Sequence, residues 1–110
     1  MLTKKDFRSG EIMPPQKDPE GFEKKILHQY ADFTDKRVLE VGCGEGRLTW
    51  KYAASTIQVA GIDLEAKRLR VALIDRGSDL ENKVSFTLAS AHNIPFNHQI
   101  FDIAILAWSL

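Results

Sequence analysis

Apolar side chains recur along the chain first at helical spacing and then in short runs typical of strands. The first segment predicts a helix over residues 19–33, with apolar positions three and four residues apart at Phe22, Ile26, Leu27, Tyr30 and Phe33. Asp18 and Pro19 are typical of an N-cap and a first helical residue. The preceding residues, 1–17, are polar around Pro14 and Pro15, so we expect a flexible leader there and one domain over 18–110.

Four further apolar segments predict strands, and two helical patterns lie between them. The strands are expected at 38–41, 57–62, 84–88 and 101–108, and the helices at 47–54 and 65–76. Gly77 is expected in the left-handed conformation that ends many helices. The last run is almost continuously apolar, as in a strand buried on both faces. This alternation predicts an α/β three-layer sandwich with a mostly parallel sheet, right-handed crossovers and helices on both faces.

Three glycines alternate at the end of the first of these strands, at Gly42, Gly44 and Gly46. Glycine adopts positive φ and has no Cβ, so the chain can turn tightly there and a ligand can approach the backbone. The predicted helix after the turn would present N–H groups that suit a carboxylate or a phosphate.

Asp63 ends the next strand, 21 residues after Gly42. In a doubly wound sheet the tip of that strand lies beside the glycine turn, where an acid can accept hydrogen bonds from both hydroxyls of a ribose. The spacing differs from the dinucleotide pattern G-x-G-x-x-G, because Arg47 stands where the third glycine would be. With Glu40 just before the turn, a nucleoside that carries an amino-acid tail fits better: Glu40 suits its ammonium, and backbone N–H groups and Arg47 suit its carboxylate.

The glycine turn with its flanks, residues 40–46, resembles motif I of class I (Rossmann-like) S-adenosylmethionine-dependent methyltransferases. Residues 61–63 resemble the end of the second strand in that family, 90–96 its cofactor loop and 101–106 its fourth strand. These motifs occur in the family order over residues 38–110, and the pattern is most similar to the small-molecule methyltransferases called type 11. The resemblance implies the N-terminal half of a seven-stranded fold with strand order 3-2-1-4-5-7-6.

The resemblance also implies a cofactor, S-adenosyl-L-methionine, and a set of residues that contact it. Gly42 and Gly44 would lie under the methionine tail, Glu40 would meet its ammonium, and Asp63 would hold the ribose diol. Leu64 and the N–H of Ala91 would contact adenine, and the carbonyl of Ala107 would contact the ammonium. The full set comprises Glu40, Gly42, Cys43, Gly44, Gly46, Arg47, Asp63, Leu64, Ser90, Ala91 and Ala107.

Ser90 departs from the family pattern, which has an aspartate that accepts from the adenine amino group. A hydroxyl accepts a hydrogen bond without a charge, so the loss is on the order of 1 kcal/mol of binding free energy.

No catalytic residue and no cluster of metal ligands is evident in the sequence. Cys43 is expected to fill a tight turn rather than to act as a nucleophile, because no partner base is evident. His92 is expected on an exposed loop, although it lies where an acid or base could act. Glu40 could instead cap the turn or form an ion pair. The helix at 19–33 could cover the sheet or close over the cofactor, and Trp108 could stack near a substrate or fill apolar space.

Charge and composition narrow the partners. Fifteen basic and fifteen acidic side chains give a formal net charge of zero, which argues against a general nucleic-acid binder. No apolar stretch approaches the length of a membrane span, and the single cysteine allows no internal disulfide, so we expect a cytoplasmic protein. The expected partner is a small-molecule methyl acceptor.

The 110 residues end directly after the fourth predicted strand. The strands that usually complete the acceptor pocket would then be missing, and the apolar fourth strand would be an exposed edge through which two copies could pair. We therefore expect a truncated chain or a homodimer formed through that edge. Two alternatives to a methyltransferase stay open at this point: a non-catalytic half-domain that binds the cofactor or pairs with a subunit, and a fragment of an NAD-dependent oxidoreductase.

Overall fold

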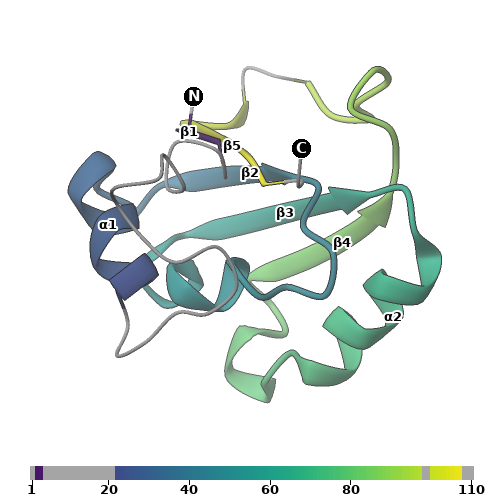
Figure 1. The fold of residues 1–110 in the computed structure, drawn as a ribbon, viewed down its shortest axis with the longest axis horizontal. Helices are drawn as coiled ribbons and strands as arrows, with labels where there is room; N and C mark the ends of the chain where they lie inside the picture. Colours follow the sequence, from purple (N-terminus) through teal and green to yellow (C-terminus); the bar gives the residue numbers. More distant parts are fainter. Residues whose placement is uncertain (1, 4–21, 98–99, 108–110) are drawn as a thin grey trace.

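The computed structural model describes residues 2–3, 22–97 and 100–107, which form a parallel sheet flanked by two α-helices and three 3₁₀ turns (Figure 1). The strands are β1 (Leu2–Thr3), β2 (Arg37–Val41), β3 (Gln58–Asp63), β4 (Val84–Leu88) and β5 (Ile103–Leu106). The helices are α1 (Phe22–Tyr30) and α2 (Ala66–Asp75). The 3₁₀ turns are Thr49–Lys51, Ala53–Ser55 and Ser78–Leu80.

The sheet order is β1-β5-β2-β3-β4, and every neighbouring pair is parallel. Read from the β4 edge, the strands that the sequence predicts come in the order third, second, first, fourth. The predicted α/β fold, Rossmann-like with a parallel sheet, is therefore confirmed. Because β2 lies in the middle, the turn that follows it opens between the ends of β3 and β5, where a doubly wound sheet has its ligand crevice.

The prediction that the fourth predicted strand forms an exposed edge is wrong. That strand is β5, and β1 pairs with it on the side away from β2, with Leu2 opposite Ile105 and Thr3 opposite Leu106. β1 falls within the expected leader, 1–17, whose residues 4–17 lie outside the described part, so the flexible leader stays a prediction. Because Ile105 and Leu106 already pair with both β1 and β2, the expected homodimer through this strand is not supported.

Alternation along the strands separates two apolar clusters, one on each face of the sheet. One cluster joins Val38 and Val59 to Leu27 of α1 and to Tyr52 of the segment after the glycine turn. The other comprises Leu39, Val41, Ala60 and Ile62, against which Ala89, Leu106, Phe96 and Phe101 pack. Burial on both faces explains why the central strands are apolar at nearly every position.

Both α-helices end earlier than predicted. α1 ends at Tyr30, so Phe33 follows the helix, yet its ring is buried and stacks on Tyr52. The predicted N-cap, Asp18, lies outside the described residues. α2 packs against β3 and β4. Within the described ranges, neither helix is long and apolar enough to cross a bilayer.

Gly77 does not adopt the left-handed conformation that the sequence suggested. Its φ is −66° and its ψ 154°, which is extended backbone. The chain passes directly from α2 into the 3₁₀ turn Ser78–Leu80, and the Gly77 carbonyl accepts a hydrogen bond from the N–H of Leu80. Arg76 is also extended, with a ψ of 121°, so two extended residues rather than a left-handed cap follow this helix.

The predicted helix at 47–54 is instead two consecutive 3₁₀ turns, Thr49–Lys51 and Ala53–Ser55. The N–H of Tyr52 donates to the Thr49 carbonyl at 3.2 Å, a three-residue step. β-branched and aromatic residues such as these have modest helix propensity. Both side chains also bind a buried carboxylate of β2, so tertiary contacts select the tighter winding.

Candidate functional site

The glycine turn leaves β2 with all three glycines at positive φ. The angles are 80° at Gly42, 57° at Gly44 and 86° at Gly46. A side chain at any of these positions would strain the backbone, because L-residues rarely adopt positive φ. At Gly46 space is also lacking, since a Cβ would lie 2.5 Å from Cζ2 of Trp50.

The N–H groups of the turn donate to the protein itself. Those of Gly42 and Cys43 reach the carbonyl of Ile62 at 2.8 and 3.1 Å, and that of Gly46 reaches the carbonyl of Cys43 at 3.0 Å. The segment that follows is 3₁₀ and only three residues long before it turns again. The turn is therefore followed by a short 3₁₀ segment rather than by the predicted α-helix, and the binding of an anion by its N–H groups stays a prediction. Arg47, which was expected to bind the carboxylate of the ligand, lines the cavity and brings a positive charge to it.

Asp63 bridges the tip of β3 and the glycine turn. Its Oδ2 accepts the N–H of Gly44 at 2.8 Å, and its Oδ1 accepts the N–H of Glu65 at 2.9 Å. These two bonds fix the plane of the carboxylate beside the turn. A carboxylate offers about four acceptor sites, so each oxygen can accept a further hydrogen bond. The acid at the second strand tip thus lies beside the turn, as the sequence analysis required.

Glu40 is a buried acid in the middle of the sheet. Its side chain is 0% exposed, and its Oε1 accepts hydrogen bonds from Thr49 Oγ1 at 2.8 Å and from the Tyr52 hydroxyl at 2.6 Å. Burial and the Glu40 carboxylate together raise the pKa of Tyr52 well above its usual value, so the phenol stays protonated and donates. Buried charges persist in proteins only where such partners exist.

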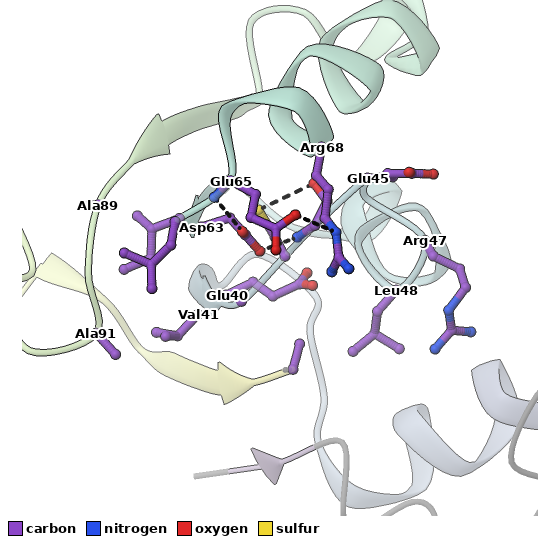
Figure 2. Close-up of a pocket in the computed structure, with 16 residues that line it drawn as sticks. Glu40, Val41, Glu45, Arg47, Leu48, Asp63, Glu65, Arg68, Ala89 and Ala91 are labelled. Carbon is purple, nitrogen blue, oxygen red and sulfur yellow. Dashed lines mark hydrogen bonds and ion pairs between the residues drawn. The ribbon is translucent and has the colours of Figure 1, made fainter. Parts of the chain in front are cut away.

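These groups line one cavity of about 550 Å³ at the carboxyl ends of β2 and β3. That volume is in the range of small-molecule sites. In the view of Figure 2, Ala89 and Ala91 lie on one side of Asp63 and Arg47 on the other, with Glu40 between. The lining residues are Glu40, Val41, Gly42, Cys43, Gly44, Glu45, Arg47, Leu48, Ile62, Asp63, Leu64, Glu65, Arg68, Ala89, Ala91 and Ala107.

Two predicted site residues do not line the cavity. Gly46 lies against Trp50, and its role in the structure is to allow that close approach. The Ser90 hydroxyl accepts the N–H of His92 at 3.0 Å and so closes its own loop. The other predicted residues all line it, and Ala107 is anchored there because its N–H donates to the carbonyl of Val41 at 2.7 Å.

Glu65 and Arg68, which line the cavity from the start of α2, were not predicted from the sequence. Arg68 Nε lies 3.1 Å from Glu65 Oε2, and Cδ of Arg68 would lie 3.8 Å from a Cβ built at Gly44. Their position one turn after Asp63 was the available signal, because the first turn of that helix borders the same crevice. Carboxylates outnumber guanidinium groups in the lining, which favours a ligand with net positive charge.

Cys43 is poorly suited to act as a nucleophile. The thiol is buried, and burial, together with the charges of Glu40 and Asp63, raises its pKa far above the usual value. His92 is exposed on the loop after β4. Trp108 lies outside the described residues, so the choice between stacking and filling stays a prediction.

The chain matches the family described as "Methyltransferase domain" over residues 32–109. The chain belongs to this methyltransferase family. The match spans the glycine turn, Asp63 and β5, and it decides against the oxidoreductase alternative.

Relatives of this methyltransferase domain are longer than the domain itself. A ubiquinone biosynthesis O-methyltransferase of Nitrosospira multiformis is 36% identical over 77 residues, which are 67% of this chain and 32% of the relative. One of the same description from Aromatoleum aromaticum is 41% identical over 81 residues, or 70% of this chain and 33% of the relative. A crystal structure described as a SAM-dependent methyltransferase of Methanosarcina mazei superposes with a TM-score of 0.60 at 29% identity, covering 74% of this chain and 40% of that one. The chain thus spans about a third of the length of these curated relatives.

Proposed function

We propose that this methyltransferase domain binds S-adenosylmethionine at the glycine turn and presents its methyl group to a small-molecule acceptor. The observation that carries the proposal is the hydrogen bond of 2.8 Å from the N–H of Gly44 to Asp63 Oδ2. It joins the turn to an acid that has acceptor capacity left for the two hydroxyls of a ribose.

The residues present fit this cofactor along the whole cavity. Asp63 would accept from the ribose hydroxyls, and Leu64, 71% exposed, offers apolar surface to the adenine beside Ala91. At the other end Glu40 would face the ammonium and Arg47 the carboxylate of the amino-acid tail. The excess of carboxylates in the lining suits the positive sulfonium.

Methyl transfer requires of the protein mainly that it align the methyl donor with the acceptor. When bound, S-adenosylmethionine would supply a methyl group activated by its positive sulfonium to a nucleophile of the acceptor. The protein's part is to hold the donor rigidly and to exclude water, with the reacting atoms about 3–3.5 Å apart. No acid or base of this chain is required for a nucleophile that loses its proton to solvent.

The acceptor is proposed to be a small molecule with a hydroxyl group. The supporting observation is that the curated relatives named above are described as O-methyltransferases. The chain spans about a third of the length of these relatives, so the proposed acceptor rests on their descriptions alone.

Calorimetry with S-adenosylmethionine, S-adenosylhomocysteine and NAD tests the cofactor. We expect the two adenosyl amino acids to bind and NAD to give no saturable heat. Tighter binding of NAD than of S-adenosylhomocysteine would overturn the proposal.

For the acceptor, methyl-labelled cofactor is incubated with matched hydroxyl and amino compounds. Label on the hydroxyl compounds is the expected result, and label on the amines alone would contradict it.

A further inference from the structure

Glu40 is the one acid of the cavity lining that is itself completely buried. Its neighbours on β2, Leu39 and Val41, belong to the apolar cluster on the opposite face of the sheet. A buried carboxylate is stable only with hydrogen-bond donors held close to it, so these donors fix the orientation of the Glu40 carboxylate.

Two hydroxyl groups donate hydrogen bonds to the same oxygen of the Glu40 carboxylate. Thr49 Oγ1 and the Tyr52 hydroxyl both donate to Oε1 of Glu40, at 2.8 and 2.6 Å. Thr49 begins the first 3₁₀ turn, and Tyr52 lies between the two turns, where its N–H donates to the Thr49 carbonyl. This single turn of chain brings both hydroxyls to the same oxygen.

Tyr52 is itself immobilised by packing. Its side chain is 1% exposed, and its ring stacks on that of Phe33 with centroids 4.8 Å apart and an interplanar angle of 24°. Phe33 in turn meets the His28 ring of α1 edge-on at 5.4 Å. The tyrosine hydroxyl therefore has a fixed place, set by the core and by α1 rather than by the cavity.

We infer that Tyr52 and Thr49 are positioning residues that hold Glu40 toward the amino-acid end of the cofactor and so set the preference of the site for ligands with an ammonium group. The inference rests on the proposed function, because it deepens the role given there to Glu40. It predicts that the two hydroxyls affect only ligands that carry the tail.

The experiment compares two thioether ligands that share the adenosine and the sulfur. S-adenosylhomocysteine carries the amino-acid tail, whereas 5′-methylthioadenosine does not. We expect Tyr52→Phe to weaken S-adenosylhomocysteine by about 10- to 30-fold, the lower part of the range for one hydrogen bond to a charged group, and to change methylthioadenosine less than about twofold. Thr49→Val is expected to act in the same way, and Thr49→Ser, which keeps the hydroxyl, to restore binding of the tailed ligand.

Matched controls separate positioning from stability. Thr56→Val removes a buried hydroxyl that donates to the Ala53 carbonyl, and Tyr30→Phe removes a phenol from an exposed side chain. Both should leave the ratio of the two affinities unchanged. If Tyr52→Phe does not fold, the Thr49 pair carries the test alone.

Equal weakening of both ligands by Tyr52→Phe and Thr49→Val would assign the hydroxyls a structural role and overturn the inference, as would no effect on either ligand. Failure of the proposed function looks different, because the unaltered chain would then bind neither ligand.

Discussion

The two ends of the cavity are built in different ways. At the glycine end, Glu40 and Asp63 are each held by two hydrogen bonds from the protein. At the loop end, Ala91 is exposed, and the hydroxyl of Ser90 is used to close its own turn. Charged groups held in place by the protein are therefore concentrated where the ribose and the amino acid would lie, whereas the adenine end offers mainly a complementary shape.

The largest effect is expected from Asp63→Asn. The amide keeps one acceptor but loses the charge, so we expect S-adenosylhomocysteine affinity to fall by about 10- to 100-fold, since a hydrogen bond to a charged group contributes about 1.5–3 kcal/mol. Calorimetric titration measures it. Asp75→Asn, at the far end of α2, removes the same charge outside the cavity and should leave affinity unchanged. Equal affinities for Asp63→Asn and the unaltered chain would show that the glycine end does not dominate binding.

Two glycine substitutions separate the role of the glycine turn in stability from its role in ligand binding. Gly46→Ala places a methyl group 2.5 Å from Cζ2 of Trp50 at a φ of 86°, and we expect it to lower the free energy of unfolding by about 2–3 kcal/mol. At Gly44, with a φ of 57°, the nearest atom would be 3.8 Å away, so Gly44→Ala should cost only about 1 kcal/mol of stability while it weakens ligand binding more than Gly46→Ala. Thermal unfolding and calorimetric titration of both variants check that Gly46→Ala loses more stability and that Gly44→Ala loses more ligand affinity. Identical losses of stability would contradict the packing account of Gly46.

At the loop end, a substitution is expected to strengthen ligand binding rather than weaken it. Ser90→Asp keeps an acceptor for the N–H of His92 and adds the charge that the family pattern has there. We expect S-adenosylhomocysteine affinity to rise by about three- to tenfold, which corresponds to roughly 1 kcal/mol. Ser78→Asp, an exposed position on another turn, controls for net charge. Weaker binding by Ser90→Asp would mean that this end is not limited by a missing charge.

The smallest effect is expected at the opposite end of β2, away from the cavity. The N–H and Nε–H of Arg37 donate to Asp102 Oδ2 at 2.9 and 3.4 Å, and the backbone bond above all lowers the pKa of Asp102. A lowered pKa in the folded state stabilises the fold above the unfolded value of 3.8, and this contribution is lost as the pH falls through the folded pKa. Asp102→Asn should therefore be slightly less stable than the unaltered chain at pH 7 and equally stable in strong acid, with unchanged ligand affinity. Thermal unfolding across pH checks the sign, and a difference that grows in acid would refute it.

The strand order was expected only from the family resemblance of the motifs. The meeting of Asp63 with the glycine turn was predictable from the pattern itself, because the carboxyl ends of neighbouring parallel strands lie at the same edge of a sheet. The 3₁₀ winding at Thr49 and Tyr52 was not, since spacing three residues apart suits an α-helix as well, and the choice depends on the distant Glu40. The pairing of β1 with β5 was equally hidden, because a two-residue strand leaves no periodic pattern. Arg68 was missed because a helix face that borders a ligand looks in sequence like a solvated one.

The most direct test of the central claim follows backbone amide resonances during titration with S-adenosylhomocysteine. The glycine turn and Asp63 are proposed to hold the ligand, so the amides of Gly44, Asp63 and Leu64 should shift with the same dissociation constant that calorimetry measures. Saturable binding that leaves Gly44 and Asp63 unmoved, with shifts confined to another part of the chain, would contradict the account.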